Sequence, residues 1–319
     1  MSQHFLLSRA ARTLSLVKVA RMSDDEAFEA FRMMRWTATE GAPVCPRCGG
    51  LTHSFLTTRK LWKCQACKHQ FSVTSDTIFA SRKMPLRTIL MAVAIFVNGA
   101  KGHSALQLSR DLDCQYKTAF VLTHKLREAI AADVAEHKAS GEVEIDGAYF
   151  GGHVRPANHK DNRVDRRKTV NQSGKRRVVV VVRERGGRTI TTVSRTEEAS
   201  VATITARIVP GTTVHADEAP GWDRLHARFL TKRINHSENY SDGEACTNQA
   251  ESFFSRLRRA EMGVHHRISG TYLGAYAGEM AWREDHRRKS NGVLYLMAAN
   301  ASLVHPVSRQ WKGYWQRRA

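Results

Sequence analysis

The chain has 319 residues, enough for two or three domains that each bury their own core. Lys and Arg number 50 against 30 Asp and Glu, which gives a formal net charge of +20. A positive field of this strength attracts polyanions, so nucleic acid is the first partner to consider. The sequence has no run of about 18 apolar residues, which argues against a membrane-spanning helix. Attachment to an anionic membrane would need a lipid anchor or a basic amphipathic helix, and neither stands out.

Residues 1–40 combine Arg and Ser with short apolar runs, but they lack a compact hydrophobic segment and a small-residue cleavage site. We interpret them as an N-terminal helical arm rather than a targeting peptide. Cysteine usage agrees with a cytoplasmic protein, because four of the six cysteines fall into one patterned cluster.

That cluster contains two Cys-x2-Cys pairs separated by fifteen residues: Cys45, Cys48, Cys64 and Cys67. Each pair can turn two thiolates toward one tetrahedral metal ion, and the spacing suits a short hairpin between the pairs. We therefore predict a zinc ribbon over residues 41–75, in which four thiolates close the ion to water and give it a structural role. Two disulfides or a redox motif are the alternatives, which the lack of a secreted context disfavours.

Residues 76–138 are predicted to be helical, because apolar residues recur at three- and four-residue spacing after Pro85. A short helix, a short turn and a longer helix follow the order of a helix-turn-helix. The exposed face of the longer helix would carry Lys117, Thr118 and His124, so we predict a DNA-binding domain with Lys117 as a contact. A plain three-helix packing unit is the alternative.

Residues 139–290 change in character to alternating apolar and polar runs. The predicted order is strand, strand, strand, helix and strand, over "EVEIDGAYF", "VVVVV", "TITTVSR", "SVATITARIV" and "TTVHAD". The valine run, residues 178–182, is apolar enough to be buried on both faces of a sheet. We therefore predict an α/β domain with a mixed central sheet and flanking helices.

Three acidic residues of this domain fall where their side chains can meet. Asp146 lies on the first strand, Asp217 at the end of the last strand, and Glu251 beside the apolar face of a later helix. Each of them taken singly fits a surface residue better, but together in one cleft they would repel one another unless divalent cations lay between them. Two Mg²⁺ ions, or Mn²⁺, would satisfy these acids and support phosphoryl transfer. Arg258 returns to nearly the same helix face as Glu251, where it could contact phosphate.

At this point the chain resembles the bacterial insertion-sequence transposases that carry an N-terminal zinc ribbon and an RNase H-like DDE domain. The resemblance runs from about residue 25 to 290 and rests on the ribbon cysteines, "EIDGAYFGG", "VHADEAPGW" and "NHSENYSDGEACTNQAESFFSRLRRAEMG". The 33 residues between Asp217 and Glu251 are the spacing that the family leads one to expect. By resemblance, Asp146, Asp217 and Glu251 are the catalytic, Mg²⁺-binding triad, and Arg258 contacts DNA. We also predict Arg256 as a DNA contact. Arg258 stands where the family often has a lysine, which keeps the charge but alters hydrogen-bond geometry.

The same resemblance implies a reaction, partners and a location. The reaction is Mg²⁺-dependent nicking at transposon ends to free a 3′-hydroxyl, followed by attack of that hydroxyl on target DNA. The partners are transposon-end DNA, target DNA and further copies of the chain, as a dimer or more on DNA. The location is the bacterial cytoplasm in association with the nucleoid, and residues 291–319 are expected to form a basic C-terminal tail.

Neighbouring residues compete for the metal site. Glu144, two residues before Asp146 on the same strand face, could support or replace it. Glu142 shares that face but lies at the strand's start, where a solvated side chain is expected. His215 and His236 could line the cleft.

Other functions remain open from the residues alone. A tyrosine-type recombinase would need a nucleophile, for which Tyr149 and Tyr240 are the candidates. A simple nuclease would cut DNA without joining it. A non-enzyme alternative is a zinc-ribbon DNA-binding regulator with an inactive RNase H-like domain.

Overall fold

The computed structural model describes residues 4–152, 156–165, 169–171, 173–234 and 246–311. The chain divides into two compact units. The ribbon unit consists of Met1–Asp133 and His286–Ala319, and the sheet unit is Val134–Asp285. None of the helices in the described part is long and apolar enough to cross a membrane.

The zinc ribbon at the start of the ribbon unit is a small antiparallel sheet, in the order β1-β2-β3. Its strands are β1 (His53–Leu56), β2 (Leu61–Cys64) and β3 (Gln70–Phe71). Trp62 of β2 stacks on Phe28 with ring centroids 5.4 Å apart, and Phe28 belongs to helix α2 (Asp24–Arg35). Aromatic packing therefore attaches α2 to the ribbon, where it supplies buried area that so small a sheet lacks.

Helix α2 begins where its sequence predicts a helix start. The Ser23 hydroxyl accepts a hydrogen bond from the Glu26 backbone N–H, and the Glu26 carboxylate accepts one from the Ser23 N–H, which completes a capping box. Acidic residues fill its first turn and basic residues its last, in the sense that the helix dipole favours.

The rest of the ribbon unit is helical: α1 (Leu16–Ala20), α3 (Leu86–Asn98), α4 (Ala105–Asp111), α5 (Tyr116–Ala131) and α9 (Asn291–Val304). Helix α4, a short connection and α5 give the short-helix, longer-helix order expected of this region. Lys117 and Thr118 are exposed on α5, but the expected exposure of His124 is wrong. His124 is 1% exposed and stacks on Trp311 with centroids 4.5 Å apart.

Helix α9 occupies part of the segment that we expected to be a basic tail. Ser290 caps its amino end, and the helix packs against α3, α5 and α2. The tail expectation was wrong for these residues because the basic side chains gather after residue 305, whereas Asn291–Val304 is largely apolar. The predicted domain limits otherwise stay predictions.

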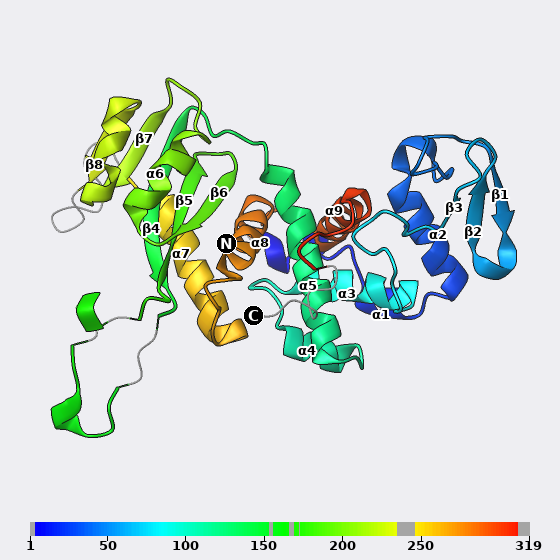
Figure 1. Ribbon diagram of the computed structural model, residues 1–319, viewed down its shortest axis with the longest axis horizontal. Helices are drawn as coiled ribbons and strands as arrows, with labels where there is room; N and C mark the ends of the chain where they lie inside the picture. Colours follow the sequence, from blue (N-terminus) through cyan, green and yellow to red (C-terminus); the bar gives the residue numbers. More distant parts are fainter. Residues whose placement is uncertain (1–3, 153–155, 166–168, 172, 235–245, 312–319) are drawn as a thin grey trace. The chain divides into compact units, whose positions relative to one another are not determined.

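The sheet unit contains a five-stranded mixed sheet in the described part of the chain, in the order β6-β5-β4-β7-β8 (Figure 1). Its strands are β4 (Glu142–Phe150), β5 (Arg177–Glu184), β6 (Thr189–Ser194), β7 (Thr213–Asp217) and β8 (Leu230–Ile234). β4 pairs antiparallel with β5 and parallel with β7. The predicted mixed α/β fold is confirmed; β8 was not predicted.

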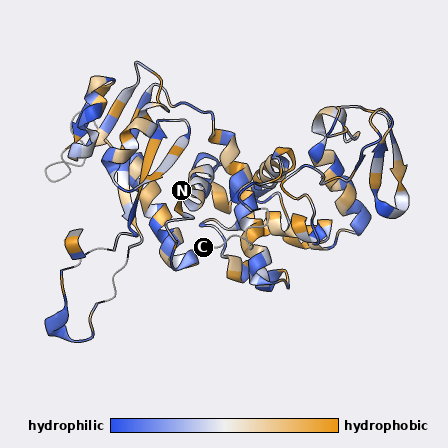
Figure 2. Cartoon of the chain, viewed as in Figure 1, coloured by the Kyte–Doolittle hydropathy of each residue, from blue (hydrophilic) through white to orange (hydrophobic). Residues whose placement is uncertain are grey.

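Helices cover both faces of this sheet: α6 (Glu197–Thr205) on one, and α7 (Asn248–Ala260) with α8 (Leu273–Asp285) on the other. The valine run of β5 serves both sides, because Val178, Val180 and Val182 pack with α6, while Val179 and Val181 pack with α7 and α8. Figure 2 shows this run as a hydrophobic band within the sheet. Burial on both faces is therefore confirmed for residues 178–182.

Candidate functional site

Asp146 lies on the face of β4 that meets α7. Side chains alternate along a strand, and Ala148 and Phe150, two and four residues further on, belong to the core beneath α7. Asp217 is the last residue of β7, whose Ala216 pairs with Ile145 in the parallel ladder. Asp146 and Asp217 each come one residue after this pair, so they lie side by side on neighbouring strands whose backbones are about 4.8 Å apart.

Glu251 reaches the same region from the first turn of α7. Phe253, Phe254 and Leu257 on the apolar side of that helix are buried against the sheet, which fixes the helix along it. Glu251 stays half-buried, and its carboxylate accepts a hydrogen bond from the Thr247 hydroxyl at 3.4 Å. The fold thus brings the three predicted acids to one end of α7.

The pKa of Asp146 reflects both its burial and the nearby negative charges. Burial raises the pKa of Asp146 to about 7, the Gly147 N–H opposes the rise, and the negative charges of Asp217, Glu251 and Glu197 add to it. The Gly147 N–H donates to the Asp146 carboxylate at 2.6 Å. Mg²⁺ binds carboxylate oxygens, and a cation among these acids would offset the repulsion between their charges. The residues therefore fit such an ion. Within the described residues, the acids do not form a set with all ligand atoms inside 4.8 Å of one another, whereas the cysteines do.

The position of Glu144 on β4 suggested a supporting metal ligand, but its carboxylate is hydrogen-bonded to the start of α7 instead. Its side chain is 1% exposed, and its carboxylate accepts hydrogen bonds from the backbone N–H groups of Gln249 at 2.7 Å and Ala250 at 3.1 Å. These donors belong to the first turn of α7, where a negative charge is favourable. Glu144 therefore anchors the amino end of the helix that carries Glu251.

Arg185 completes this anchor. Its Nε donates to Glu144 at 3.1 Å, and its other nitrogens reach the exposed carboxylate of Glu142 and, at 3.3 Å, the carbonyl of Cys246 just before α7. His215 of β7 is buried 3.5 Å from Glu142, and burial, with Arg185 nearby, lowers its pKa. The other histidine candidate, His236, lies outside the described residues.

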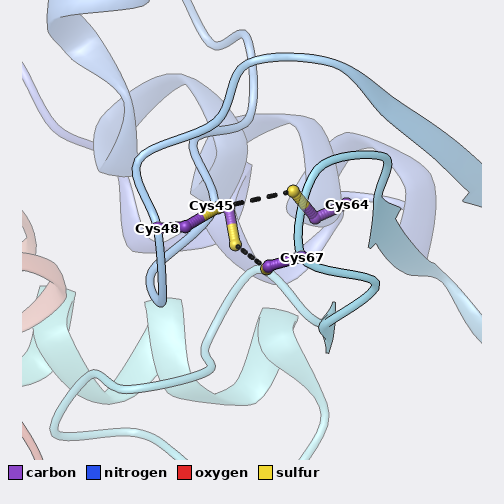
Figure 3. Close-up of side chains that lie close together, drawn as sticks. All are labelled: Cys45, Cys48, Cys64 and Cys67. Carbon is purple, nitrogen blue, oxygen red and sulfur yellow. Dashed lines mark hydrogen bonds between the residues drawn. The ribbon is translucent and has the colours of Figure 1, made fainter.

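The four ribbon cysteines converge from the two Cys-x2-Cys turns (Figure 3). Their ligand sulfurs all lie within 4.8 Å of one another; Cys45 and Cys67 are 3.6 Å apart, as are Cys48 and Cys64. Zn–S bonds of about 2.3 Å in a tetrahedron require sulfurs about 3.8 Å apart, whereas disulfide bonds would require about 2 Å. All six cysteines are free thiols. The cluster therefore fits structural Zn²⁺ and excludes the disulfide alternative.

The acidic site and the cysteine cluster both lie in segments that match models of one protein family. Residues 138–285 match the ISXO2-like transposase domain, and residues 22–70 match the transposase zinc-ribbon domain of the same family, IS1595. Together the two matches cover more than half of the chain. The chain belongs to the IS1595 transposase family. No curated protein matches it. The two domains imply DNA as the partner of this IS1595-family chain.

Glu197, at the start of α6, is an acid near the site of this IS1595-family protein that the sequence did not single out. A Cβ on Gly147 would lie 2.6 Å from the Glu197 carboxylate, so only glycine lets Glu197 approach β4 beside Asp146. Burial and the charge of Asp217 raise the pKa of Glu197. The signal available in the sequence was the helix start "TEEAS", in which Thr196 caps α6.

The basic candidates divide into two groups. Arg258 is exposed, with its guanidinium 5.4 Å from the Phe150 ring centroid, and Lys117 is exposed on α5. Arg256 instead forms an ion pair with Glu284 of α8, which ties α7 to α8. DNA contact by these three residues stays a prediction.

The tyrosine alternatives receive little support from their surroundings. Tyr149 packs against the core on the α6 side of the sheet, away from Asp146, and the Arg176 guanidinium lies 4.3 Å from its ring centroid. Tyr240 lies outside the described residues.

Removal of zinc provides a prediction for the ribbon. We expect about one Zn²⁺ per chain, and we expect a strong chelator to release it and to abolish the ribbon's structure, because its strands are too short to fold alone. Metal analysis and the near-ultraviolet circular dichroism of Trp36 and Trp62 measure both effects. Replacement of Cys64, which is buried, should act like the chelator, whereas Cys114→Ser, outside the cluster, should keep the zinc. Stoichiometric zinc in the Cys64 variant would contradict the assignment.

Proposed function

We propose that the protein is an active DDE transposase of a bacterial insertion sequence, which nicks DNA at transposon ends and joins the freed 3′-hydroxyl to target DNA. The observation that carries this proposal is the meeting of Asp146, Asp217 and Glu251 at one end of α7, where their charges act on one another. Such a group costs stability unless cations neutralise it, and a purely structural sheet has no need of it.

The proposed roles follow from the positions of the side chains. Asp146, Asp217 and Glu251 would hold two Mg²⁺ or Mn²⁺ ions, which when bound activate the attacking hydroxyl and stabilise the leaving oxygen. Arg258, further along α7, would hold a phosphate of the same strand. Lys117 on α5 and Arg256 would add contacts to DNA, and the protein would work as a homo-oligomer at the bacterial nucleoid.

The reaction itself distinguishes this proposal from its alternatives. We expect wild-type protein with Mg²⁺ to convert a labelled transposon-end duplex into nicked product and then into a product joined to target DNA. Asp217→Asn and Glu251→Gln should each lower both products by about 10³-fold, since each removes several kcal/mol of transition-state stabilisation, while DNA binding persists. Asp223→Asn, an exposed acid of the same unit, serves as the control.

Other outcomes would identify another protein class. Cleavage without joining would indicate a nuclease. DNA binding without cleavage by wild type would indicate a regulator. Undiminished cleavage in both triad variants would refute the triad.

A further inference from the structure

A second feature of the sheet unit lies at the far end of β4. A cavity of about 580 Å³ is lined there by residues that include Gly151, Gly152, Lys175, Arg177, Arg267 and Ser269. They come from the end of β4, the start of β5 and the segment before α8. Gly151 and Gly152 have φ of +68° and +67°, and a Cβ on Gly152 would lie 3.0 Å from the Arg176 Cα. Glycine at these positions therefore allows the turn that shapes the cavity.

The described residues around this cavity leave it positively charged. Of the lining residues that the structure describes, three are cations and none is an acid. Arg177 donates to the carbonyls of Gly174 at 2.9 Å and Arg176 at 2.7 Å, which fix its guanidinium. Across the described residues, neither Lys175 nor Arg267 forms an ion pair with an acid. Both side chains are exposed, so their charges are available to an anion.

The lining also limits what that anion can be. None of the described lining residues is an aromatic side chain on which a base could stack. Cations, a hydroxyl and glycine backbone are the groups that proteins use to hold the sugar-phosphate backbone without reading its sequence. A cavity of this size is larger than one free phosphate needs, which favours a phosphate that belongs to a chain.

The cavity and the carboxylates lie on the same face of the sheet. Ile268 of the lining and Phe150 of β4 belong to the core beneath α7, the face that carries Asp146. Asp146 and Gly151 are five residues apart along the strand, which corresponds to about 17 Å. Arg258 stands over Phe150 between them. Phosphates of one DNA strand advance by about 3.4 Å per nucleotide along the helix axis and also turn around it, so a straight interval of this length spans about three nucleotides.

We propose that this cavity binds a backbone phosphate of the DNA strand that is cut at Asp146, about three nucleotides from the cut. The inference rests on the proposed function for the identity of the strand. It adds a site that is separate from the carboxylates and independent of base sequence, and that would set the position of the strand along α7.

A pair of double variants tests the site. Lys175→Gln with Arg267→Gln removes two charges from the cavity. Lys138→Gln with Arg228→Gln removes the same two kinds of charge from exposed positions before β4 and β8, at the opposite end of the parallel strands. Both pairs are exposed, so folding should be unaffected, and thermal unfolding checks this.

The measurement is the dissociation constant of a fluorescently labelled duplex as a function of NaCl concentration. The slope of log affinity against log salt should become shallower by about 0.9 for the cavity pair, because one phosphate contact is lost, and should not change for the control pair. With a transposon-end duplex, ethylation of the phosphate about three nucleotides from the cut should weaken wild-type binding and leave the cavity pair unaffected.

An unchanged slope in the cavity pair, or an equal loss in the control pair, would overturn the inference. These results are independent of the proposed reaction. Wild-type protein that never cuts or joins DNA would contradict the proposed function even if the cavity pair lost its phosphate contact. A wild-type protein that cuts and joins, with an unaltered slope in the cavity pair, would remove only the cavity site.

Discussion

The Asp146→Asn variant is expected to lose DNA cleavage and joining by about 10³-fold or more, and yet to be more stable than wild type at pH 8 without divalent metal. The asparagine amide is neutral and keeps an oxygen to accept the Gly147 N–H, which in wild type lies 2.6 Å from the carboxylate. It therefore removes the charge that burial, Asp217 and Glu251 oppose, while it leaves the local backbone contact in place.

The pH dependence of this gain has a definite sign. The pKa of Asp146 is about 7 in the folded protein and about 4 in an unfolded chain. Below pH 4 the carboxyl is protonated in both states and costs nothing. Between about pH 4 and pH 7 the unfolded chain has released the proton while the folded protein holds it, so wild-type stability falls as pH rises. The gain from asparagine should be absent near pH 4 and reach about 2 kcal/mol above pH 7, after allowance for partial solvent screening.

Urea unfolding at pH 4 and pH 8 measures this difference. Mg²⁺ should raise the stability of wild type at pH 8 more than that of the variant, because the variant has one charged ligand fewer. Asp223→Asn is the matched control, since Asp223 is an exposed acid paired with Arg233 at 3.2 Å. That control should change stability by less than about 1 kcal/mol, at either pH. An Asp146→Asn protein no more stable than wild type at pH 8 would contradict the expected electrostatic cost.

Those parts of the fold that depend on local pattern could be predicted from the sequence. The spacing of the Cys-x2-Cys pairs determines the ribbon, and the valine run of β5 has no polar position that could face water. The segment "LTKRI" of β8 was not predicted, because Lys232 and Arg233 mask its strand character at the edge of the sheet. Helix α8 was not predicted for a related reason. Its buried residues include the charged Glu279 and Arg283, which pair with each other at 2.8 Å, so its sequence lacks a continuous apolar stripe.

The candidate site shows the same division between local and distant information. Asp146, Asp217 and Glu251 could be proposed from strand ends, a helix face and a family resemblance. The role of Glu144 could not, because its partners Gln249 and Ala250 are 105 and 106 residues away. Glu197 was missed because only the absence of a side chain at Gly147 allows its approach. Contacts of this kind are set by tertiary packing, which sequence spacing does not record.

Substitution of Glu144 by glutamine is expected to lower the free energy of unfolding by about 3 kcal/mol, as the loss of one partner from a buried ion pair does. Glutamine would leave the Arg185 charge without its buried partner. It would also turn an N–H₂ group or a weaker acceptor toward the Gln249 and Ala250 N–H donors, which lie 2.7 Å and 3.1 Å from the carboxylate. Glu142→Gln is the matched control, because Glu142 bonds the same Arg185 but its side chain is 51% exposed. It should cost less than about 1 kcal/mol.

The anchor of α7 should matter for catalysis beyond stability, since Glu251 lies one residue after Ala250. Under conditions where the Glu144→Gln protein is fully folded, DNA cleavage should still fall by at least about tenfold, with a higher Mg²⁺ concentration needed for half-maximal rate, because a shift of the first turn by about 1 Å weakens the ligand geometry. A purely structural role would leave that Mg²⁺ dependence unchanged in the folded fraction. If the Glu144 and Glu142 variants cleave DNA equally well, then the hydrogen bonds at the amino end of α7 stabilise the fold without positioning Glu251.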